Sequence, residues 1–144
     1  MLRTLYRKLK DENAAMRALA ARNGWKFFDH PNPAPVGSFV TTVLYFTNSV
    51  RYIYDMQGSA HGKDFDVYAV AGFYDTAKWP MGNPAAAVGA IHYATILRTP
   101  IMLSQPANLP KEYFMTQWQG YQYVVYGGNA VNEEQLNKLL DFLS

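Results

Sequence analysis

The sequence predicts an α+β domain in which a curved, mostly antiparallel sheet of about five to seven strands is covered by an N-terminal and a C-terminal helix. Three observations predict this fold. An amphipathic, alanine-rich run opens the chain, a leucine stripe behind a capping residue closes it, and aromatic and β-branched runs of strand length lie between them. We expect residues 1–144 to form a single α+β domain, because the chain contains no repeat and no boundary.

The first helix is predicted over 2–23, where alanines raise helix propensity. Gly24 suits the left-handed position that follows a helix end. In that case Trp25 should pack back on Leu19 or Ala20 and be mainly buried, which makes it a structural clamp rather than the wall of a binding site. The apolar residues of the helix recur at spacings of three and four, at Leu2, Leu5, Leu9, Met16 and Leu19.

Runs of strand length follow along the chain. Two glycines predict a loop at 57–62, so 50–56 and 65–74 are expected to form a hairpin, and Gln119-Gly120 is expected to turn a second hairpin. The stretch 75–90 contains Trp-Pro and Gly-Asn-Pro and predicts a mobile or functional loop. The predicted strands are 25–28, 39–46, 50–56, 65–74, 91–97, 113–118 and 121–126, and 100–103 is either a further strand or the second part of a single interrupted strand that begins at 91.

A final helix is predicted over 133–143. Asn132 is a suitable N-cap, Gln135 follows it by three residues, and Val131 can form a hydrophobic staple with Leu136. Two glutamates favour the positive helix start. The stripe of this helix that should face the sheet consists of Leu136, Leu139, Leu140 and Leu143.

Several segments occur in an order that resembles a family of uncharacterised bacterial soluble domains. They are "ALAARNGWKFF", "VRYIYDMQGSAHGKDFDVYAVAGFYD", "RTPIML" and "YQYVVYGG". The resemblance covers most of the chain and implies an N-terminal helix ending in Gly-Trp, an antiparallel sheet and a short C-terminal helix. The family's usual Leu-Pro pair is Thr99-Pro100 here. The resemblance implies no reaction, cofactor or catalytic residue.

Composition and motifs exclude several classes of chemistry. The absence of cysteine excludes disulfides, thiolate metal sites and cysteine nucleophiles. No Gly-x-Ser-x-Gly elbow is present, and no apolar run approaches the roughly 18 to 20 residues of a membrane-spanning helix. His30, His61 and His92 are evenly spaced, but none forms a local pair typical of metal ligands. We therefore expect no catalytic residue, no metal and no cofactor.

Two aspartates are the best candidates for ligand contacts. Asp64 and Asp66 flank Phe65 and therefore share one face of a strand, with His61 in the neighbouring turn as a partner for proton transfer. The alternative is that both aspartates are solvated on the outer face of an edge hairpin. Trp79 is the candidate wall of a ligand pocket near the 75–90 loop.

Positive charge is concentrated at the start of the chain. Residues 1–26 carry seven basic and two acidic side chains, a net charge of +5, whereas the remainder carries a net charge of −3. A basic amphipathic helix suits an anionic membrane surface, and an ordinary solvated helix face is the alternative. Nucleic acid is not expected as a partner, because the body is acidic and has no known binding motif. The candidate partner surface comprises Arg3, Arg7, Lys8, Lys10 and Arg17.

Together these observations predict a cytoplasmic, non-enzymatic binding or interaction module, peripheral to a membrane if the basic helix docks there. The alternative function is a small-molecule-binding protein or small enzyme with its pocket near 75–90. We also expect contact with a protein partner or self-association, through the heptad-like seam of the first helix or through tyrosine-rich strand edges.

Overall fold

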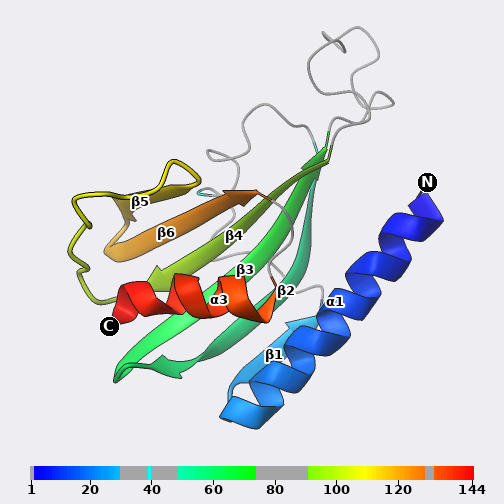
Figure 1. The fold of residues 1–144 in the computed structure, drawn as a ribbon, viewed down its shortest axis with the longest axis horizontal. Helices are drawn as coiled ribbons and strands as arrows, with labels where there is room; N and C mark the ends of the chain where they lie inside the picture. Colours follow the sequence, from blue (N-terminus) through cyan, green and yellow to red (C-terminus); the bar gives the residue numbers. More distant parts are fainter. Residues whose placement is uncertain (1, 30–38, 40–48, 74–90, 129–131) are drawn as a thin grey trace, which may run out of the picture.

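The computed structural model describes residues 2–29, 39, 49–73, 91–128 and 132–144. They form a six-stranded antiparallel sheet of order β1-β2-β3-β4-β6-β5, with both long helices on the same face (Figure 1). The predicted α+β architecture is confirmed. The elements are α1 (Leu2–Asn23), β1 (Lys26–Asp29), β2 (Ser49–Ala60), β3 (Lys63–Phe73), β4 (Ile91–Thr99), β5 (Tyr113–Trp118), β6 (Tyr121–Gly128), α3 (Glu133–Leu140) and the 3₁₀ helix η2 (Asp141–Leu143).

Helix α1 has the predicted bounds and ends in a Schellman motif. Gly24 has a φ of 72°, which places it in the left-handed region that favours glycine. The Trp25 N–H donates to the Ala20 carbonyl at 2.9 Å, and the Gly24 N–H donates to the Ala21 carbonyl at 3.3 Å. These two bonds satisfy carbonyls that the helix end would otherwise leave free, and they direct the chain into β1.

Trp25 joins the end of α1 to the β2–β3 hairpin. Its ring meets Phe65 edge to face with centroids 5.1 Å apart, and its Nε1–H donates to the Ser59 carbonyl at 3.2 Å. The side chain is half-buried rather than mainly buried, because the indole N–H reaches the exposed end of β2. The role as a clamp therefore agrees with the geometry, whereas the predicted degree of burial was too high.

A polar contact fixes the middle of α1 to the sheet. Asn13 is buried, and its amide donates to Asp29 Oδ1 at 3.0 Å and to the Ile53 carbonyl at 3.2 Å, beside a register shift in the β2–β3 pairing. Arg17 forms an ion pair with the other oxygen of Asp29. One carboxylate on β1 thus receives two side chains from successive turns of the helix.

The β2–β3 hairpin is longer than predicted. The expected loop at 57–62 is wrong, since Gln57 to Ala60 continue β2 and only His61 and Gly62 form the turn. Both turn residues have positive φ, 54° and 76°, which matches the right-handed twist of the strands and permits a two-residue turn. The β5–β6 hairpin turns at Gln119 and Gly120 as predicted, again with positive φ at both positions.

Other differences concern strand ends. β4 continues to Thr99, and the predicted strand 100–103 is absent because Pro100 interrupts the extended run. Phe39 is the one described residue of the predicted strand 39–46, and its backbone is helical. The rest of that strand, the 75–90 loop and the staple residue Val131 lie outside the described residues.

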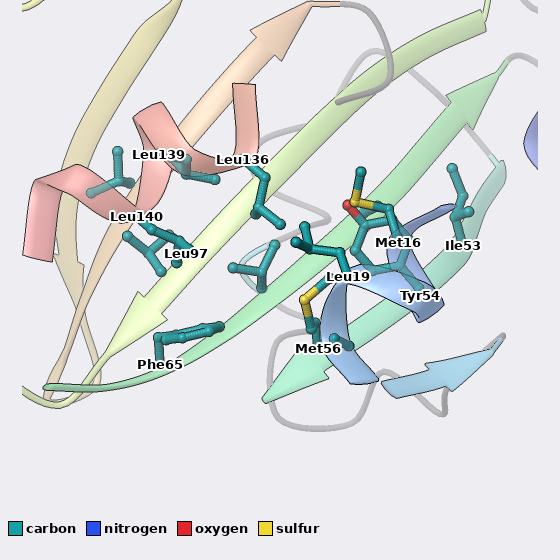
Figure 2. Close-up of a cluster of buried hydrophobic side chains, with 14 of the residues drawn as sticks. Met16, Leu19, Ile53, Tyr54, Met56, Phe65, Leu97, Leu136, Leu139 and Leu140 are labelled. Carbon is teal, nitrogen blue, oxygen red and sulfur yellow. The ribbon is translucent and has the colours of Figure 1, made fainter. Parts of the chain in front are cut away.

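The larger core lies between the sheet and the two helices (Figure 2). Asn132 caps α3 as predicted, accepting the Gln135 N–H at 2.9 Å. The predicted leucine stripe of α3 and η2 is buried and faces β3 and β4, while Met16 and Leu19 of α1 face β2 and β3. A second buried cluster lies on the other sheet face and contains Phe39, Tyr68, Val70, Ala94, Ile96, Tyr123 and Val125.

Candidate binding site on the second sheet face

Polar side chains cross the sheet on the face opposite α1 and α3, which we call the second face. Because side chains alternate along a strand, Phe65 and Val67 point to the helices while Asp64 and Asp66 lie on the second face. The strand register then aligns one residue from each of the six strands. This polar row consists of Lys26, Gln57, Asp66, Arg98, Tyr123 and Thr116.

An ion pair occupies the centre of the polar row. Arg98 Nη2 lies 3.2 Å from Asp66 Oδ2, and the two side chains are only 12% and 21% exposed. The guanidinium carbon stands 4.1 Å from the centre of the Tyr121 ring, and Tyr123 is the register partner of Arg98 on β6. Arg98 is therefore held by a carboxylate and an aromatic face.

Asp55 lies on β2 two residues before Gln57 and on the same face of the sheet. Its register partners are Phe28 of β1 and Tyr68 of β3. It is 6% exposed. Gln57 Nε2 donates to its Oδ2 at 2.9 Å, whereas its Oδ1 has no hydrogen-bond partner in the part of the chain that the structure describes. A buried carboxylate oxygen without a donor is costly, so this atom marks an incomplete polar environment.

Burial raises the pKa of Asp55 from its ordinary value to about 6. The hydrogen bond from Gln57 lowers this pKa, the charge of Asp66 raises it and the charge of Arg98 lowers it. Burial also raises the pKa of Asp66, against the lowering effect of Arg98. The pKa of Tyr52, on the same face, is raised to about 12 by burial. Perturbed acidic groups gathered in one place are typical of binding and catalytic sites.

Asp55, Gln57, Asp66 and Arg98, which we call the cluster, are unbalanced in charge. Asp55 and Asp66 supply two carboxylates, and Arg98 supplies one guanidinium, which Asp66 already pairs. Arg98 Nε is a second buried atom without a hydrogen-bond partner among the described residues. With Asp55 ionised, these buried and half-buried side chains carry a net charge of −1 and have free hydrogen-bonding capacity, while the other cation of the polar row, Lys26 of β1, is exposed to solvent.

The arrangement suits binding better than catalysis. No Ser, Thr or Cys nucleophile is paired with a base among the side chains of the cluster described above, and an activated nucleophile needs such a base. Within the described ranges, no group of three or more His, Cys, Asp or Glu side chains could hold a metal ion. The carboxylates of the cluster can accept hydrogen bonds and attract positive charge, and a carboxyl group with a raised pKa can also transfer a proton.

The structure separates the residues that the sequence analysis grouped. Asp66 belongs to the polar row, whereas Asp64 is exposed and accepts a hydrogen bond from Ser59 Oγ. The interpretation of an edge hairpin is wrong, because β2 and β3 lie inside the sheet and Asp66 is half-buried. His61 stands in the turn with Nε2 3.4 Å from Asp141 Oδ1, so it is directed to η2. Trp79 lies outside the described residues.

The candidate partner surface on α1 is described only in part. Arg3, Arg7, Lys8 and Lys10 lie within the helix, but the structure describes side chains only from Asn13 onward. Arg17 pairs with Asp29, and farther along the helix Arg22 lies 3.1 Å from Glu133 of α3. All four of these paired side chains remain about half-exposed.

Three members of the cluster escaped the sequence analysis: Asp55, Gln57 and Arg98. A signal existed, because Asp55 interrupts the strand run "YIYDM" and Arg98 interrupts "TILRT". Their proximity to Asp66 depends on the register of β2, β3 and β4, which the alternation of side chains alone does not determine.

No protein-family model, curated protein or solved structure matches this chain. The resemblance to uncharacterised bacterial domains therefore stays a prediction, and function has to be inferred from the chemistry of the site. Among the residues described, no helix is long and apolar enough to cross a membrane.

Proposed function

We propose that this protein is a non-enzymatic binding domain that receives a small polar ligand on the second sheet face, at Asp55 and the adjoining centre of the polar row. One observation supports this proposal above the others. Asp55 is 6% exposed, yet its Oδ1 has no hydrogen-bond partner in the described part of the chain. A ligand that donates to this oxygen would supply the missing bond.

A purely structural role explains Asp55 less well. Its neighbour Gln57 satisfies one oxygen only, and burial destabilises the ionised carboxylate rather than favouring it. An apolar residue would fit between Phe28 and Tyr68 without this cost. Sites that depart from the rules of stable folding in this way are often functional.

The side chains around Asp55 are more exposed toward the His61 turn. Gln57 and the Asp66 carboxylate are half-buried, and Asp64, on the same face of β3, is exposed. Because Asp55 Oδ1 is itself buried, a ligand that comes along β2 and β3 from the end nearest the His61 turn has to displace neighbouring side chains to reach it. Preformed polar groups that converge beside an apolar cluster are characteristic of small-molecule sites.

Chemical-shift mapping of the folded chain with a library of amines, carboxylates and neutral polar metabolites tests the proposal. We expect at least one compound to shift the resonances of Asp55, Gln57, Asp66 and Arg98 and to raise the melting temperature. Asp66→Asn should weaken that response, since it removes the partner of Arg98, whereas Asp64→Asn should not. A library in which no compound perturbs these resonances would show that the second face is not a ligand site.

A further inference from the structure

We propose that the ligand carries a primary ammonium group, and that this group binds Asp55 Oδ1 between the rings of Phe28 and Tyr68. This inference rests on the proposed function and specifies the class of ligand. Three independent features of the described residues lead to it: the charge of the cluster, the hydrogen-bonding capacity of its free atom, and the aromatic residues on either side of Asp55.

Charge favours a cation. Arg98 is the largely buried cation of the polar row, and it is committed to Asp66 and the Tyr121 ring, whereas the row's other cation, Lys26, is exposed to solvent. Asp55 receives only the neutral amide of Gln57 as a direct partner. One monovalent cation at Asp55 would therefore balance the two carboxylates, whereas an anion would meet two like charges in a poorly solvated environment.

The free atom favours an N–H donor. Asp55 Oδ1 is an acceptor, and a carboxylate forms its strongest hydrogen bonds with charged donors. A primary ammonium supplies three such donors on a compact group. A quaternary ammonium would supply the charge but could not satisfy the oxygen.

The flanking aromatic residues also suit an ammonium group. Phe28 on β1 and Tyr68 on β3 are the register partners of Asp55, so all three side chains stand next to one another on the second face. Phe27, the neighbour of Phe28, stacks on Tyr54 of the helix-covered core, which confirms that Phe28 faces the other way. Aromatic faces attract cations, and Phe28 is 44% exposed, so its ring is accessible to a ligand.

Binding of an ammonium ion at Asp55 should depend on pH. The titratable and charged groups that face Asp55 are Asp66 and Tyr68 from β3 and Arg98 from β4, while β1 presents the uncharged Phe28 opposite Asp55 and the exposed Lys26 two residues earlier. Because the pKa of Asp55 is about 6, the carboxyl group would release its proton to solvent when the cation binds at lower pH. Affinity should therefore fall about tenfold for each pH unit below 6.

The test uses the intact chain and n-butylammonium as the probe, with n-butanol, butyrate and a quaternary alkylammonium as comparison compounds. Isothermal titration at pH 7.5 and pH 5 measures affinity, and carbon-detected NMR follows the carboxyl carbon of Asp55. We expect butylammonium to bind most tightly, to lower the titration midpoint of Asp55, and to bind at least tenfold more weakly at pH 5. Asp55→Asn should reduce affinity at least tenfold, and Asp64→Asn should leave it unchanged.

Distinct results would overturn the two proposals. Equal affinity for butanol or butyrate, or tighter binding of the quaternary ion, would overturn the ammonium assignment while leaving a ligand site on the second face. Binding that is independent of pH and leaves the Asp55 carboxyl carbon unshifted would do the same, and this measurement needs no variant that might fail to fold. No perturbation of the second face by any compound would instead overturn the proposed function.

Discussion

The indole of Trp25 lies against the backbone of Gly58, with no space for a side chain between them. A Cβ at Gly58 would stand 2.1 Å from Trp25 Cδ1 and 2.6 Å from Trp25 Cγ. Since the same ring contacts Phe65 and donates to the Ser59 carbonyl, it cannot swing aside without losing both interactions. Gly58 thus serves close approach rather than a turn, which explains a glycine in the middle of a regular β2–β3 pairing.

Gly58→Ala should lower the free energy of unfolding by about 2–3 kcal/mol, because the rigid indole must move and overpacked sites cost this much. Urea unfolding followed by tryptophan fluorescence measures the change. Gly127→Ala is the matched control, since a Cβ there would meet only the Glu112 carbonyl oxygen at 3.9 Å, an ordinary contact. If Gly58→Ala and Gly127→Ala lowered the free energy of unfolding equally, the role of Trp25 as a clamp would be contradicted.

Asp55→Asn should change the pH dependence of stability. Because the pKa of Asp55 is about 6 in the folded chain and 3.8 ordinarily, the folded state binds more protons between these values. The contribution of Asp55 to the free energy of unfolding is therefore greatest below about pH 4 and is lost as the pH rises to about 6. The asparagine variant lacks this loss, so its stability relative to the parent chain should rise with pH.

Because the pKa of Asp55 rises from 3.8 to about 6 on folding, Asp55 can change the free energy of unfolding between pH 4 and pH 7 by at most about 3 kcal/mol. Urea midpoints for both chains at several pH values measure it. Asp64→Asn provides the control for a carboxylate on the same face that is exposed. If the two asparagine variants showed the same pH profile, the buried state of Asp55 would be in doubt.

The free edge of β5 is the place where we expect self-association. β1, at the opposite edge, is bridged to α1 by Asp29, whereas β5 contains no charged residue and exposes Phe114 and Trp118. An uncharged edge strand invites pairing with a second copy. We expect sedimentation velocity to show a concentration-dependent dimer, and Gln117→Lys to weaken it by placing like charges together.

Asn137→Lys on the exposed face of α3 adds the same charge away from this edge and should leave the dimer intact. A chain that stays monomeric at high micromolar concentration would argue against both the β5 edge and the predicted seam of α1. If instead both lysine variants dissociated the dimer, general charge repulsion would be the cause.

Docking of α1 at an anionic membrane remains a prediction from charge. Replacing Arg3, Arg7, Lys8, Lys10 and Arg17 with glutamine should abolish co-sedimentation with anionic vesicles, and salt should weaken the binding of the parent chain. Neither the parent chain nor the glutamine variant should co-sediment with neutral vesicles. Because Asp29 already pairs Arg17, we expect Arg17→Gln alone to have a smaller effect than Arg7→Gln. Equal recovery in all cases would leave α1 as a solvated structural helix.

The helices and hairpins could be predicted because their signals are local. Asn132 and Gly24 mark helix ends through their own backbone and side-chain chemistry, and Gln119-Gly120 marks a turn in the same way. The loop at 57–62 was predicted wrongly for an equally physical reason. A glycine in a strand run suggests a break, but Gly58 lies within β2 and makes room for the distant Trp25.

The binding site was less predictable. Asp66 could be proposed from its place beside Phe65, yet Asp55 and Arg98 become its neighbours only through the pairing of β2 with β3 and β3 with β4. Burial of Asp55 depends in turn on residues distant in sequence. A charged residue inside an apolar strand is a usable signal, but it does not say which other strands complete the site.

The polar row also restricts how the strands can align during folding. A slip of one residue would turn Asp66 toward the leucines of α3, and a slip of two residues between β3 and β4 would set it opposite Ile96 or Pro100 and separate it from Arg98. Either misalignment would leave the charges of Asp66 and Arg98 unpaired. The loss of this ion pair therefore disfavours sheets with misaligned strands. Each strand contributes one polar side chain to the row that selects a single register.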